Sequence, residues 1–88
     1  MPTISIFFGI VIQMYWRDHP PAHIHAYYQG HEGVFAIGDG ELIAGRLPPT
    51  ATKLVRGWID ERRDELLANW KRARMSLPLE AIAGADQP

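Results

Sequence analysis

The sequence predicts an α+β fold, in which a small antiparallel β-sheet meander of about four strands carries one long amphipathic C-terminal helix on one face. The first half is rich in β-branched and aromatic residues and is interrupted by turn residues. Asp39-Gly40 is typical of a two-residue hairpin. Beyond it, apolar residues recur every three or four positions, which is the helical period. We expect one domain over residues 1–83 and a loose C-terminal tail over residues 84–88.

The first predicted strand covers residues 3–16 and is apolar on both faces. Gly9 in its middle predicts a bulge. In a simple meander this strand lies at an edge, where natural strands are short, charged or covered. We therefore expect its outer edge to be covered by the C-terminal tail, a second copy of the chain or another protein. The residues expected on one face are Ile4, Ile6, Phe8, Ile10, Ile12 and Met14.

Three further strands, separated by turns, are predicted after the first. A turn that contains Pro20 and Pro21 connects the first strand to them. In the first of the three, alternation places His23, His25 and Tyr27 on the face that points away from the helix. The three predicted strands cover residues 22–29, 34–38 and 41–47.

The predicted helix begins near Thr50 and runs to about Met75. Gly57 in its middle is expected to allow close packing against the sheet, and Pro78 stops the helix. The apolar stripe of this helix contains Leu54, Val55, Trp58, Ile59, Leu66, Trp70 and Ala73.

Composition excludes several classes of protein. A formal net charge of −1 argues against a tight, salt-driven nucleic-acid binder. The chain has no cysteine, so it has neither disulfides nor thiolate metal sites, and this composition fits a reducing cytoplasm. The apolar run over residues 4–12 is too short to span a bilayer. We expect a soluble cytoplasmic protein that does not contact the membrane.

Three of the four histidines lie within seven residues, and they form the main candidate site. His23 and His25 are two apart on a predicted strand, so both imidazoles emerge on one face and could reach one metal ion. His19 and Asp18 in the preceding turn could complete the ligand set for a divalent metal. The same residues also suit a purely structural role, with the imidazoles hydrogen-bonded to the backbone, to Asp18 or to Tyr27.

A metal-independent ribonuclease is a further interpretation of this segment. His23 or His25 would act as general base and acid, while Arg17 or Arg46 would steady the phosphate. The rings of Tyr15 and Tyr27 could stack on RNA bases from the same sheet face. The binding residues expected on either interpretation are Asp18, His19, His23, His25, Tyr15 and Tyr27.

A pattern spread over most of the chain is shared with a known family. It consists of Met1-Pro2-Thr3-Ile4-Ser5, Phe7-Phe8-Gly9-Ile10, Met14-Tyr15, Asp18-His19, Pro21, His23-Ile24-His25-Ala26, Tyr28, Gly45, Leu47-Pro48, Leu54-Val55, Trp58-Ile59, Glu65-Leu66, Asn69-Trp70, Pro78-Leu79 and Ile82. In this combination the chain resembles the bacterial domain-of-unknown-function 4160 family. It departs from that pattern at Ile6 and Gln13, where the family often has arginine, and at Thr50.

The resemblance implies a component of a small two-gene bacterial module, paired with a protein of the domain-of-unknown-function 2442 family. It supplies no catalytic residues. Our first hypothesis is therefore a non-enzymatic interaction or regulatory module of a toxin–antitoxin-like gene pair, which binds a protein partner or a second copy through the first strand. The ribonuclease and the metal-binding protein are the two alternatives.

Overall fold

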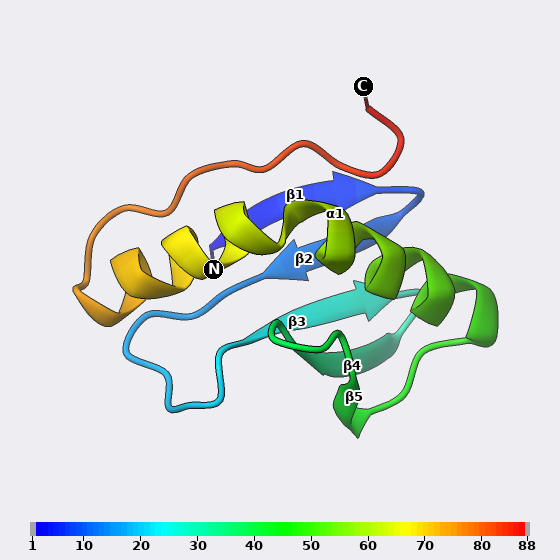
Figure 1. Ribbon diagram of the computed structural model, residues 1–88. Helices are drawn as coiled ribbons and strands as arrows, with labels where there is room; N and C mark the ends of the chain where they lie inside the picture. The colour runs from blue at the N-terminus through cyan, green and yellow to red at the C-terminus, as the bar shows by residue number, and fades with distance from the viewer. Residues whose placement is uncertain (1, 88) are drawn as a thin grey trace.

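The computed structural model describes residues 2–87 and contains a five-stranded antiparallel sheet with one long helix across one face (Figure 1). The order β1-β2-β3-β4-β5 across the sheet follows the sequence, so the sheet is a meander. The predicted α+β fold is confirmed, with five strands where about four were expected. The elements are β1 (Thr3–Phe7), β2 (Ile10–Gln13), β3 (His23–Tyr28), β4 (His31–Ala36), β5 (Leu42–Gly45) and α1 (Pro49–Arg74).

The single strand expected over residues 3–16 is wrong, because β1 and β2 form a hairpin. Its turn consists of Phe8 and Gly9, with φ angles of 50° and 76°. Positive φ at two successive residues is what a type I′ turn requires. Phe8 is apolar, so the apolar run continues through the turn and hides it. The turn also changes which residues are buried: Ile6 and Phe8 are 60% and 52% exposed, whereas Phe7 is buried.

Strand register divides the sheet into a core face and an outer face. On the core face Ile24 of β3 pairs with Phe35 of β4, and both are fully buried. At the alternate position His25 pairs with Gln13 on β2 and with Val34 on β4. This row points away from the core, as the period of two predicts.

The helix lies over the core face, as expected, and has two unpredicted features. Arg62 has non-helical backbone angles (φ −111°, ψ 17°), which mark an irregularity in the middle of α1. Gly57 is exposed, and a Cβ placed there meets nothing within 4 Å, so the expected close packing at Gly57 is wrong. The helix buries Ala51, Val55, Trp58, Ile59, Leu66, Asn69 and Ala73.

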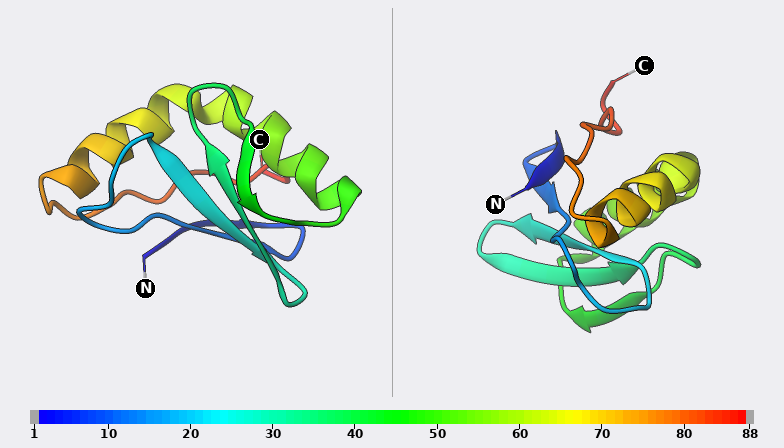
Figure 2. Two further views of the ribbon diagram at one scale, coloured as in Figure 1. Left: turned by 90° about the horizontal axis from the view of Figure 1, so that it is seen from below. Right: turned by 90° about the vertical axis from the view of Figure 1, so that its left-hand side faces the viewer.

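After α1 the chain turns back and runs beside β1 (Figures 1 and 2). The amide of Ile82 donates to the carbonyl of Ile4 over 2.8 Å, and the Ile82 side chain is buried. Further along, Asp86 accepts a bond of 3.4 Å from the Phe8 amide. The C-terminal segment therefore occupies the outer edge of β1, the first of the three coverings expected for that edge. Residue 88 of the expected loose tail lies outside the described residues.

Within residues 2–87, no helix combines the length and the apolar character that crossing a bilayer demands.

Candidate functional site

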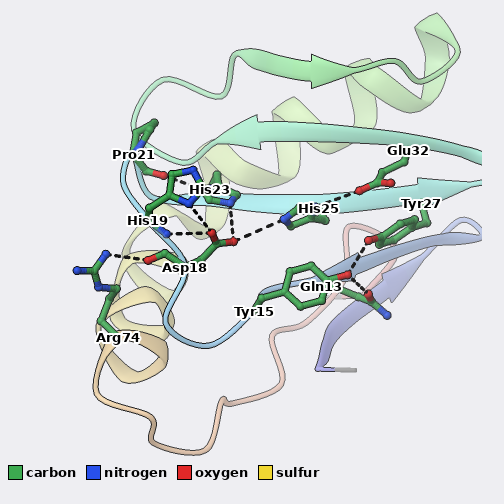
Figure 3. A network of polar contacts seen from close by, with 10 residues as sticks. All are labelled: Gln13, Tyr15, Asp18, His19, Pro21, His23, His25, Tyr27, Glu32 and Arg74. Carbon is green, nitrogen blue, oxygen red and sulfur yellow. Dashed lines mark hydrogen bonds and ion pairs between the residues drawn. The ribbon is translucent and has the colours of Figure 1, made fainter.

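The candidate site is built where the loop between β2 and β3 meets the C-terminal end of α1 (Figure 3). The amide of Arg17 donates to the carbonyl of Ala73 over 3.2 Å. The guanidinium of Arg74 donates to the carbonyl of Asp18 over 2.7 Å. These two bonds hold the loop on the helix and place the Asp18 carboxylate in front of the first residues of β3.

His23, the first residue of β3, has both ring nitrogens against oxygen acceptors. Its Nδ1–H donates to the carbonyl of Pro21 over 2.7 Å, and its Nε2 lies 2.9 Å from Oδ2 of Asp18. His23 is 7% exposed, and its ring lies against Trp70 of α1, with ring centroids 5.2 Å apart. A neutral imidazole carries one N–H. With that N–H on Nδ1, Nε2 presents its lone pair to the Asp18 carboxylate.

The contact with Trp70 corrects one expectation. His23 was expected on the face away from the helix, but it packs beside α1. It stands at the end of the sheet, where the loop and the last turns of α1 close over it. His25, two residues further along β3, follows the expectation and lies on the outer face.

His25 directs one ring nitrogen to a carboxylate, and its other ring nitrogen has no hydrogen-bond partner among residues 2–87. Its Nδ1 lies 3.1 Å from Oε2 of Glu32 on β4. Its Nε2 is buried, has no hydrogen-bond partner within residues 2–87, and lies 3.8 Å from Oδ2 of Asp18. The ring of Tyr15 meets the imidazole edge-on, with centroids 4.6 Å apart. A buried nitrogen without a partner is costly unless something absent from the protein itself binds it.

Asp18, His23 and His25 therefore form one group of metal-ligating side chains, in which all three ligand atoms lie within 4.8 Å of one another. His19, the other expected ligand, is not in this group. Its side chain is 88% exposed, and its Nδ1 lies 3.0 Å from the other carboxylate oxygen, Oδ1. The structure thus assembles three of the four expected metal ligands.

The electrostatics of Asp18 favour its ionised form. Partial burial acts to raise its pKa, but the hydrogen bond from the His19 amide and the nearby His23 and His19 side chains outweigh burial and lower the pKa below 3.8. The carboxylate is therefore charged at neutral pH and available as a ligand.

A chain of hydroxyl groups continues from the site across the outer face (Figure 3). The Tyr15 hydroxyl donates to Oε1 of Gln13 over 2.9 Å, so the Tyr27 hydroxyl donates to Tyr15 over 2.6 Å. Burial, and then this bond to Tyr15, raise the pKa of Tyr27 above its ordinary range. The two tyrosines expected to stack on bases are thus adjacent to the histidines, and their hydroxyls bond to each other.

The two arginines expected to steady a phosphate lie in different places. Arg17 is in the loop, one residue before Asp18. Arg46 follows β5 and lines a different pocket, beside the first half of α1. Glu32 is a site residue that the sequence analysis missed. Only the pairing of β3 with β4 brings it to His25.

Comparison with known proteins identifies the family. The model of the family described as Domain of unknown function (DUF4160) matches residues 9–71. The match spans more than half of the chain, which therefore belongs to the DUF4160 family, as the shared residue pattern indicated. No curated protein and no solved structure matches the chain.

Proposed function

We propose that this member of the DUF4160 family binds a divalent transition-metal ion, with zinc the best suited, through Asp18, His23 and His25. The observation that carries the proposal is the buried Nε2 of His25, which faces the Asp18 carboxylate without a hydrogen-bond partner. Imidazole and carboxylate are both common zinc ligands.

The spacing of the ligand atoms suits a tetrahedral ion. Bonds of about 2.0–2.1 Å to zinc place tetrahedral ligand atoms about 3.4 Å apart. The carboxylate oxygen Oδ2 of Asp18 lies 2.9 Å from Nε2 of His23 and 3.8 Å from Nε2 of His25, so the two separations bracket that value. All three ligand atoms lie within 4.8 Å of one another, so a closer approach of the two imidazoles around the carboxylate oxygen would complete the coordination.

The groups behind the histidines also fit metal binding. Metal-ligating histidines usually donate their second ring N–H to a backbone carbonyl or a carboxylate, which fixes the tautomer. Here Nδ1 of His23 faces the Pro21 carbonyl, and Nδ1 of His25 faces Glu32. Both tautomers are thereby set with Nε2 toward Asp18, the orientation that coordination requires.

Zinc titration of the metal-free protein, followed by competition with a chromogenic chelator, tests the proposal. We expect one ion per chain, and cobalt(II) should give the absorption of a tetrahedral site. His25→Gln should weaken zinc binding by more than about 100-fold, whereas Glu32→Gln, which changes only an outer partner, should weaken it by about tenfold.

His31→Gln is the matched control, because His31 is exposed at the start of β4 and lies outside the ligand group. It should bind zinc as tightly as the native protein. Native protein that binds no zinc, or a His25→Gln variant that binds as well as native, would overturn the proposal.

A role in a toxin–antitoxin-like pair is the second candidate, and the open edge of the sheet supports it. Strand β5 is exposed along its whole length, its Ile43 is 48% exposed, and β5 forms the edge opposite β1. Uncovered apolar edge strands are suited to pairing with a strand of another protein. A cytoplasmic protein of the domain-of-unknown-function 2442 family would pair here rather than at β1. Co-purification with that partner should be lost in Ile43→Lys, and retention would count against this candidate.

The ribonuclease alternative has less support. Both ring nitrogens of His23 already face acceptors, and its ring is buried, so a substrate hydroxyl has poor access to it.

A further inference from the structure

An open pocket of about 560 Å³ lies between the loop after β2 and the last turn of α1, where it is bordered by Arg17, His19, Arg74 and Ser76. We propose that this pocket binds a phosphate group. The inference goes beyond metal binding and does not depend on it, since the pocket and the three metal ligands share only Asp18.

The two arginines of the pocket, Arg17 in the loop and Arg74 at the end of α1, differ in their ion pairing from four other arginines of α1. Within residues 2–87, Arg17 and Arg74 form no ion pair with a carboxylate. The four paired arginines are Arg56 with Glu41, Arg62 with Glu65, Arg63 with Asp60, and Arg72 with Glu80. Two unneutralised guanidinium groups at one pocket favour an anion from outside the chain.

Both guanidinium groups are anchored and retain free donors. Nε of Arg17 donates to the Ser76 hydroxyl over 2.9 Å, and Nη1 of Arg74 donates to the Asp18 carbonyl over 2.7 Å. Each arginine has five N–H donors in a rigid fork, so most of them remain available. Holding a fork in place before binding reduces the entropy lost when it binds an oxyanion.

The backbone around the pocket is strained on both sides. Arg17 and Ser76 each have a φ of 57°, a left-handed conformation that non-glycine residues seldom adopt. Such strain gathers at ligand clamps, where the surrounding contacts maintain it. Here the two strained residues are Arg17 and Ser76, whose side chains hydrogen-bond to each other at the pocket.

Two nearby groups of oxygen acceptors already have partners within the protein. The oxygens of Asp18 already face His19 and His23. The carbonyls that end α1 are also occupied: Ala73 accepts from the Arg17 amide, and Arg72 accepts from the Leu77 amide. The exposed His19 ring adds a further polar group at the rim. An incoming anion therefore meets mostly N–H donors.

Phosphate is the anion that this arrangement suits best. Its oxygens accept paired hydrogen bonds from arginine forks, and two guanidinium groups together supply enough donors for several of those oxygens. The same chemistry is present in a small phosphorylated metabolite and in an RNA backbone, and the experiment distinguishes the two sources.

The test is calorimetric titration of metal-free, full-length protein, first with inorganic phosphate and then with a short single-stranded RNA. Native protein should bind phosphate, and the double variant Arg17→Gln with Arg74→Gln should bind it at least about tenfold more weakly. Arg56→Gln removes one arginine charge from an exposed, ion-paired site outside the pocket, and this variant should bind phosphate as native does. Circular dichroism establishes that each variant is folded.

Each outcome decides something. RNA that binds more tightly than phosphate and loses that affinity in the double variant assigns the pocket to a nucleic-acid backbone, whereas phosphate binding without RNA binding assigns it to a small ligand. No phosphate binding by native protein, or an equal loss in Arg56→Gln, overturns the proposal. Because metal is absent throughout, the result is independent of whether the zinc proposal holds.

Discussion

At the scale of single residues, Asp18 connects three parts of the molecule. Its carbonyl accepts from Arg74 at the end of α1. One carboxylate oxygen accepts from the His19 amide within the loop, and the other faces His23 and His25 on β3. A side chain with this many contacts is more constrained than an ordinary turn aspartate, which bonds only to neighbouring amides.

Asp18 predicts a specific loss of stability in acid. Its pKa is lowered on folding, so its ionised form stabilises the fold fully above the unfolded value near 3.8, and this contribution is lost as the pH falls through the folded pKa. Native protein should therefore unfold at a higher temperature than Asp18→Asn at pH 7, and the gap should close below about pH 4. Thermal unfolding in metal-free buffers between pH 2.5 and 7 measures it. A gap that widens in acid would contradict the assignment.

At the scale of elements, one position in β5 requires glycine, whereas one position in α1 does not. Gly45 has a φ of 69°, and a Cβ there would overlap the carbonyl oxygen of Glu32 on the paired strand. Gly57 has open space around it in the helix. The first position requires glycine to let two backbones approach, and the second does not.

The two glycines predict stability changes of opposite sign. Gly45→Ala should destabilise the protein by more than about 2 kcal/mol, because both the left-handed backbone and the close contact oppose a side chain. Gly57→Ala should stabilise it by about 0.5–1 kcal/mol through higher helix propensity, a rise of roughly 2–8 °C in a domain of this size. Urea unfolding of both variants checks this. Equal effects of the two substitutions would show that the local backbone does not decide them.

At the scale of the whole molecule, the segment after α1 ties the helix to the edge of the sheet. Asn69 is buried and exchanges two hydrogen bonds with the backbone of Glu80, over 2.8 Å and 3.0 Å. The indole N–H of Trp58 donates to the carbonyl of Ala83 over 2.8 Å. Through these bonds and the bond from Ile82 to Ile4, the segment joins buried residues of α1 to the outer edge of β1.

Asn69→Ala should therefore cost about 2–4 kcal/mol, because it leaves buried backbone groups of the C-terminal segment unpaired and opens a small void. Amide exchange should also accelerate at Ile82, whose amide bonds to β1. Lys71→Ala, at an exposed position on the same helix, should change stability by less than about 0.5 kcal/mol. An Asn69 variant as stable as native would mean that the segment contributes little to the fold.

The fold class and part of the site followed from local patterns in the sequence. The helix over residues 49–74 and the strand that carries His23 and His25 follow recognisable periods, so the sequence predicts the presence and place of both elements, although not the irregularity at Arg62 or the burial of His23. The hairpin at Phe8 and Gly9 was missed, because an apolar turn residue leaves the pattern unbroken and the turn depends on backbone angles that alternation does not report.

The sequence by itself determined which residue types gather near Asp18, since turn and strand place them within a few positions of one another. Only the tertiary structure decided that His19 lies outside the group, that Glu32 stands behind His25, and that Arg17 and Arg74 border one pocket. The physical reason is distance along the chain. Contacts within a strand or turn follow from its period, whereas contacts between β3 and β4, or between a loop and the end of a helix, depend on how the whole chain packs.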